Sequence, residues 1–269
     1  MRKCTILDGP MGSELESRGF ALGLPTWSAT AVRKAPALVR EIHAAYVNAG
    51  ATVHTANTFR TQPRHFPDTF AALTSEAIAL ARAAVPKTHR VFGSVAPLED
   101  CYRPDLARTD SSAVRAHGEM VGALVDAGVD GLVCESFSNL DEGLLAARLA
   151  AASRCETWLS FTPGPAGTLL SAEEIAVGAE RALDLGVDAV LINCATIEFV
   201  DRALEGLARV CEKFGVYANA YGVSPEAYAD AGVRWRKAGA TILGACCGAS
   251  AAHVRALAEC VARVDVAYR

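Results

Sequence analysis

The chain has 269 residues, of which 51% are hydrophobic and 21% are charged, and its formal net charge is −4. This balance is typical of a globular protein, and the intermixed acidic and basic residues leave no basic stripe that could neutralise a nucleic-acid backbone. The N-terminal segment reaches Asp8 after a short apolar run, which is too short for a signal-peptide core or a membrane span. We therefore expect a cytoplasmic protein that binds neither nucleic acid nor a membrane.

A short run rich in β-branched residues, followed by an alanine-rich helical stretch, recurs eight times along the chain. The expected strands cover residues 4–8, 52–56, 91–95, 131–135, 158–162, 189–194, 216–220 and 241–245. The expected helices cover residues 36–49, 73–84, 112–127, 140–151, 172–185, 197–210, 225–238 and 250–264.

Four of these helices end in a similar short sequence motif that contains a glycine. The glycines are Gly50, Gly128, Gly186 and Gly239. A glycine at this point fits the left-handed residue that stops a helix before the next strand. Eight strand–helix units with apolar strands predict an α/β fold, a (β/α)8 TIM barrel that forms a single domain over residues 1–269. A doubly wound open sheet is the alternative.

Polar residues gather where the expected strands end, which is the edge that carries the site in a barrel of this kind. They are Asp8, Gly9, Asn57, Thr58, Ser94, Glu135, Ser136, Ser160, Thr162, Asn193, Cys194, Asn219, Cys246 and Cys247. Acidic, amide and thiol groups at one mouth predict a site for a small polar molecule and a metal ion.

Cysteine supplies the most specific signal. Cys246 and Cys247 are adjacent and flanked by glycines that permit a backbone bend, and Cys194 ends the sixth unit. Three sulfur ligands suit a catalytic zinc site, which keeps a fourth position open. The alternative is a buried pair of small residues, whereas nine cysteines in a chain without an export signal argue against a disulfide framework. His43 and His54 lie on apolar elements and are expected to be core or rim residues rather than ligands.

An ordered set of motifs over nearly the whole chain resembles the homocysteine S-methyltransferase family, whose domain also forms the homocysteine-binding module of methionine synthase and of betaine-homocysteine methyltransferase. The matching segments are residues 7–15, 24–29, 43–51, 55–60, 93–97, 135–142, 192–194, 217–219 and 244–248. The order of these segments is more specific than any one of them.

The resemblance implies roles for individual residues. Cys194, Cys246 and Cys247 take the positions of the three zinc ligands, and Glu135 takes that of the carboxylate that binds the homocysteine amino group. The turn at Asp8 and Gly9 takes the position that helps to receive the amino acid.

Two further residues, Asn57 and Trp27, are weaker candidates for substrate contacts. An aromatic residue in a loop is more often packed against the body of the protein than placed over a ligand.

The predicted activity is zinc-dependent transfer of a methyl group from a small sulfonium donor, S-methylmethionine or S-adenosylmethionine, to the zinc-bound thiolate of homocysteine, which gives methionine. Departures from the family pattern at Arg60, at Ala245 and in the connection after Asn219 bear on the donor. One alternative is a methyl-acceptor domain that works with a separate corrinoid or folate protein. Another is a non-catalytic barrel that binds zinc or an amino acid, while a zinc hydrolase is disfavoured because three thiolates weaken zinc as a Lewis acid.

Overall fold

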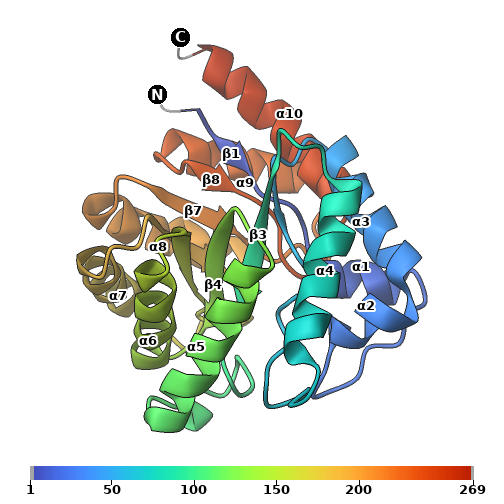
Figure 1. Cartoon of the computed structure of the whole chain (residues 1–269). Helices are drawn as coiled ribbons and strands as arrows, with labels where there is room; N and C mark the ends of the chain where they lie inside the picture. Colours follow the sequence, from blue (N-terminus) through green and yellow to red (C-terminus); the bar gives the residue numbers. More distant parts are fainter. Residues whose placement is uncertain (1–2, 268–269) are drawn as a thin grey trace.

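The computed structural model describes residues 3–267, and its central feature is one sheet of eight parallel strands surrounded by helices (Figure 1). The strands are β1 (Thr5–Ile6), β2 (Val53–Thr55), β3 (Arg90–Val95), β4 (Gly131–Phe137), β5 (Glu156–Phe161), β6 (Ala189–Asn193), β7 (Phe214–Tyr217) and β8 (Ile242–Leu243). Each strand from β2 to β7 pairs with the next along the chain, in parallel register.

The first strand closes the sheet on itself. Thr5 and Ile6 of β1 pair with Ile242 and Leu243 of β8, and a parallel bridge joins Leu7 to Val53 on the other side. An open doubly wound sheet has two free edges, so this pairing excludes it and confirms the predicted (β/α)8 barrel. All the strand ends that carry the predicted site residues therefore open at the same rim.

The helices form the outer layer (Figure 1). They are α1 (Met11–Ser17), α2 (Ala31–Lys34), α3 (Pro36–Asn48), α4 (Phe70–Ala84), α5 (Ser111–Asp126), α6 (Leu140–Ala152), α7 (Ala172–Asp184), α8 (Ile197–Val210), α9 (Pro225–Lys237) and α10 (Ala251–Ala267), with 3-10 turns at Ser28–Thr30 and Pro104–Leu106. Five of them begin at a side chain that accepts hydrogen bonds from the first-turn amides, and these caps are Asp110, Asn139, Ser171, Thr196 and Ser224.

The glycines that were expected to end helices do so in the left-handed conformation. Gly50, Gly128, Gly186 and Gly239 have φ values of 99°, 77°, 85° and 107°. This conformation lets the chain leave the helix and turn into the next strand without a clash at a Cβ atom.

The strands differ from prediction mainly at their carboxyl ends. The first and last strands are shorter than expected, because Asp8 and residues 244–247 leave the ladder to form the rim, whereas β4 runs two residues further, to Phe137. Among residues 3–267, no helix is both long enough and apolar enough to cross a membrane.

Gly215 allows β7 and β8 to approach closely. A Cβ atom at this position would lie 2.5 Å from the carbonyl oxygen of Ile242, which is backbone and cannot move aside without separating the strands. We expect Gly215→Ala to lower the free energy of unfolding by about 1–3 kcal/mol. Gly122→Ala is the matched control, since that helical glycine has no neighbour within 4 Å and should gain about 0.5–1 kcal/mol. Urea denaturation of both variants measures the difference, and equal stabilities would contradict the strand contact.

Candidate metal centre and active site

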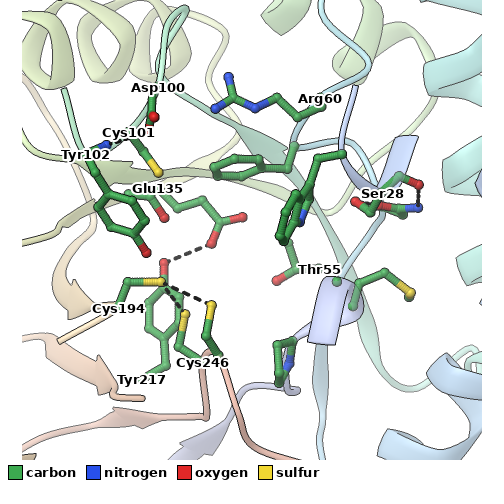
Figure 2. A pocket seen from close by; sticks show the side chains of 18 of the residues that line it. Ser28, Thr55, Arg60, Asp100, Cys101, Tyr102, Glu135, Cys194, Tyr217 and Cys246 are labelled. Atoms are coloured by element: carbon green, nitrogen blue, oxygen red, sulfur yellow. Dashed lines mark hydrogen bonds between the residues drawn. The ribbon is translucent and has the colours of Figure 1, made fainter. Parts of the chain in front are cut away.

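A cavity of about 500 Å³ opens at the carboxyl rim of the barrel (Figure 2). It is lined by all eight residues for which we predict substrate or metal roles, namely Asp8, Gly9, Trp27, Asn57, Glu135, Cys194, Cys246 and Cys247. The fold thus brings together groups that lie up to 239 positions apart in the chain, from Asp8 to Cys247.

The three cysteines converge on one point of this cavity. The Sγ atom of Cys194 lies 2.6 Å from that of Cys246 and 3.9 Å from that of Cys247, and all three sulfurs lie within 4.8 Å of one another (Figure 2). Cys194 follows β6 with a φ of 51°, a left-handed conformation that non-glycine residues seldom adopt. Gly248, with a φ of 79°, turns the chain directly after the cysteine pair. The strained conformation of Cys194 and the turn that Gly248 permits aim the sulfurs at a common centre.

This arrangement fits a zinc ion. Two thiolates on one tetrahedral zinc lie about 3.8 Å apart, because each Zn–S bond is about 2.3 Å long. The separation of Cys194 and Cys247 already has this value, and small side-chain rotations would open the closer pair by about 1 Å.

The protonation of the three cysteines also favours a bound cation. Hydrogen bonds with Cys194 and Cys246 lower the pKa of Cys247 to about 3, whereas hydrogen bonds with the other two cysteines and burial raise the pKa of Cys246 well above its ordinary value. A nearby cation is therefore required before all three sulfurs become thiolates.

Glu135 points into the cavity because β4 is irregular at this residue. The pairing of β4 with β5 shifts register between Cys134 and Phe137, and Ser136 has a φ of 65°. The carboxylate of Glu135 accepts hydrogen bonds from the hydroxyls of Ser94 and Tyr217, the latter at 3.1 Å (Figure 2). Burial raises the pKa of Glu135, so a positive group beside it would be stabilised.

Asp8 and Gly9 form the turn between β1 and α1. Oδ2 of Asp8 accepts a hydrogen bond of 2.9 Å from the backbone N–H of Thr55, and burial raises the pKa of Asp8 well above its ordinary value, with a further contribution from the charge of Glu135. A Cβ atom at Gly9 would lie 2.5 Å from the ring of Tyr46, so only glycine fits this turn. A buried carboxyl group at Asp8 and a half-buried one at Glu135 in the same cavity are suited to an ammonium group.

Asn57 and Trp27 line the cavity in different ways. Both polar atoms of the Asn57 side chain are hydrogen bonded to Ser28, through Oδ1 at 2.6 Å and Nδ2 at 2.9 Å, so this amide holds the loop that carries Trp27 (Figure 2). Trp27 has a φ of 47°, and its side chain is 37% exposed. Its indole packs over Gly12, where a Cβ atom would lie 2.6 Å from Nε1. It presents an aromatic surface to the cavity.

His43 and His54 are buried, as the sequence predicted for core residues. Burial lowers the pKa of His43 to about 4 and that of His54 to about 3, so both rings are uncharged at neutral pH. Their ring nitrogens group with the carboxylate of Asp8, all within 4.8 Å of one another.

Several lining residues were not identified from the sequence. Tyr217 belongs to the matching segment 217–219, but the sequence predicts no role for it. The loop after β3 adds Cys101 and Tyr102 to the cavity lining (Figure 2). Only the position of Cys101 and Tyr102, in a loop that follows a strand at the carboxyl rim, could have identified them from the sequence.

Arg60 lies at the end of the cavity away from the cysteines (Figure 2). Its Nη1 donates to the carbonyl oxygens of Pro97, at 3.1 Å, and Glu99, at 3.0 Å. The guanidinium therefore braces the loop after β3.

Comparison with known proteins agrees with this geometry. A family model described as homocysteine S-methyltransferase matches residues 5–261. The homocysteine S-methyltransferase of Escherichia coli (strain K12) is 32% identical over 295 aligned residues, which cover 94% of this chain and 93% of that protein. A methionine synthase from Mycobacterium tuberculosis is 27% identical over 98% of this chain, and the match spans 25% of that longer protein.

Solved structures give the same result. The metallated form of the homocysteine methyltransferase MmuM from Escherichia coli aligns with a TM-score of 0.84 at 30% identity, over 96% of each chain. A 3-dehydroquinate dehydratase from Geobacillus kaustophilus, at 11% identity and a TM-score of 0.59, shares the barrel fold alone. The length of the family match, the identity to the bacterial relative and the structural alignment show that this chain belongs to the homocysteine S-methyltransferase family and is an enzyme of that family.

Proposed function

We propose that this enzyme transfers a methyl group from a small sulfonium compound to the thiol of homocysteine, giving methionine, with a zinc ion held by Cys194, Cys246 and Cys247. The observation that carries the proposal is the meeting of three sulfurs within 4.8 Å of one another in the cavity that Glu135 also lines. The nine cysteines, all free thiols, suit the reducing cytoplasm.

When held by Cys194, Cys246 and Cys247, zinc would bind the sulfur of the substrate in its thiolate form and so provide a nucleophile at neutral pH. The homocysteine sulfur then gives an electron pair to the methyl carbon, and the carbon–sulfur bond of the donor breaks with its electrons moving to the leaving thioether. The proton of the thiol is released to solvent. Cys194, Cys246 and Cys247 would hold the ion, and the substrate sulfur would be its further ligand.

Homocysteine, the methyl acceptor, is oriented by charged groups that bind its amino-acid end, opposite the sulfur. Glu135, held by Ser94 and Tyr217, pairs with the ammonium group of homocysteine, and the carboxyl group of Asp8, whose pKa burial raises, lies in the same cavity. Backbone N–H groups of the turn at Gly9 are suited to bind the carboxylate end. Fixing both ends of a short amino acid places its sulfur at the metal.

The donor side of the cavity favours a cation. Trp27, Phe59 and Tyr102 line it with aromatic rings, which attract positive charge, and the guanidinium of Arg60 already lies 5.0 Å from the centre of the Phe59 ring. Arg60, the cation in the sequence that would repel a sulfonium, is bound to two backbone carbonyls and points away from the cysteines. A sulfonium needs no further activation, so position and exclusion of water suffice.

The second candidate is a methyl-acceptor domain that uses a corrinoid or folate partner. The match to a quarter of a methionine synthase favours it, since the same barrel there belongs to a longer protein. The two candidates differ in whether methionine forms with a free sulfonium alone.

The metal ligands can be tested with Co²⁺, which gives an intense charge-transfer band in the ultraviolet when sulfur binds it. Cys194→Ser, Cys246→Ser and Cys247→Ser should each weaken this band and abolish methionine formation, because each removes one of three thiolates. Cys101→Ser is the control, since Cys101 lines the same cavity outside the three-sulfur cluster. An unchanged band in all three variants would refute the assignment.

The acceptor site can be tested by calorimetric titration of homocysteine into the zinc-loaded protein. Glu135→Gln removes the charge that pairs with the ammonium and should weaken binding by about ten- to a hundredfold while zinc remains bound. Tyr217→Phe removes only one hydrogen bond to that carboxylate and should weaken binding by a smaller factor. Wild-type affinity in Glu135→Gln would return Glu135 to a structural role.

The donor can be tested in a reaction that contains only the zinc-loaded enzyme, homocysteine and S-methylmethionine or S-adenosylmethionine. Methionine should form, and Trp27→Leu should raise the KM for the donor by about two- to thirtyfold through loss of the aromatic face. Leu106→Ala is the control, because Leu106 is exposed and lies outside the cavity lining. If methionine appears only when a corrinoid protein is added, the partner-dependent candidate replaces the sulfonium proposal.

A further inference from the structure

A second group of metal-ligating side chains lies beside the cavity, away from the cysteines. Asp8 follows β1, His43 lies on α3 and His54 lies on β2, and one ligand atom from each is within 4.8 Å of the others. The exposed fractions are 4% for Asp8 and 0% for both histidines. Three elements far apart in sequence therefore bring two imidazoles and a carboxylate into one buried place.

The imidazoles of this group are not satisfied by the polypeptide. Within the part of the chain that the structure describes, both ring nitrogens of His43 and Nδ1 of His54 are buried without a hydrogen-bond partner. Nε2 of His54 is the exception, and it lies 3.2 Å from Nδ1 of His89. Buried polar atoms are nearly always partnered, and leaving them unpaired costs free energy. Unpartnered nitrogens on both rings, together with one ligand atom of each ring within 4.8 Å of a carboxylate oxygen of Asp8, indicate a missing ligand.

Water and a metal ion would satisfy these atoms differently. A water molecule could hydrogen bond to the rings, but it brings no charge to compensate the buried carboxylate of Asp8. A divalent ion accepts a lone pair from each imidazole and neutralises the carboxylate at the same time. Two histidines and one aspartate form a ligand set that suits zinc and neighbouring transition ions better than calcium or magnesium, which prefer oxygen ligands alone.

We propose that Asp8, His43 and His54 form a second metal site, which binds a divalent transition ion such as Zn²⁺ between β1, β2 and α3. The site shares no ligand with the cysteine cluster, and its nitrogen and oxygen donors differ chemically from the three sulfurs. Asp8 also lines the cavity in which we place homocysteine, so the second ion would lie beside the substrate site.

The test uses full-length protein, prepared metal-free under reducing conditions and titrated with Co²⁺. Wild-type protein should bind two ions per chain, one with a sulfur charge-transfer band and one with visible ligand-field bands only. The triple variant C194S/C246S/C247S should keep one ion and lose the charge-transfer band. Adding His43→Leu to it should remove the remaining ion, and His54→Val should do the same.

Two controls make the result decisive. His253→Leu, added to the triple variant, removes a buried imidazole whose two nitrogens are hydrogen bonded to Ser250 and Val223, so cobalt binding should persist. Circular dichroism reports whether each variant is folded. A folded triple variant that binds no Co²⁺ would overturn the second site, and so would one whose binding survives both histidine substitutions. Loss of the charge-transfer band from wild-type protein would count against the cysteine site instead.

Discussion

The pairing of β1 with β8 is the constraint on which the rest of the molecule depends. Parallel strands present their carboxyl ends at the same edge, and closure turns that edge into one rim. Without closure, Asp8 and the cysteine pair at 246–247 would belong to opposite edges of an open sheet. With it, they lie beside each other, and the backbone N–H of Ala245 donates to the carbonyl oxygen of Asp8 at 3.2 Å.

Irregular backbone then aims the side chains that the rim supplies. Trp27, Ser136 and Cys194 all have positive φ values without being glycines, and all three line the cavity. Such conformations cost free energy and persist only where the surrounding packing enforces them. The buried barrel interior, which includes Phe92 and Trp158 in tilted ring contact, provides that packing directly beneath the site.

Charge is the second organising feature of the cavity. Three cysteines, Glu135 and Asp8 concentrate acidic groups in one cavity, where burial raises the pKa of both carboxyl groups and makes negative charge costly. Every partner proposed for the site is positive at the atom that contacts these groups: a metal ion, an ammonium group or a sulfonium. The same logic extends to the group formed by Asp8, His43 and His54, where one carboxylate faces unpartnered imidazoles.

The sequence by itself determined the barrel, most helix boundaries and the family, because these depend on local periodicity, on glycines such as Gly128 that end helices, and on an ordered set of motifs. It also indicated Cys194, Cys246 and Cys247 as a ligand set, although their binding of zinc stays a prediction. Only the tertiary structure decided what contacts each residue makes. From the sequence, Arg60 is a cation that would repel a sulfonium donor. In the structure, its guanidinium donates hydrogen bonds to backbone carbonyls of the loop after β3. His43 and His54 looked like ordinary core residues, because neither the distance of their nitrogens from Asp8 nor the lack of hydrogen-bond partners is encoded within a short stretch of chain.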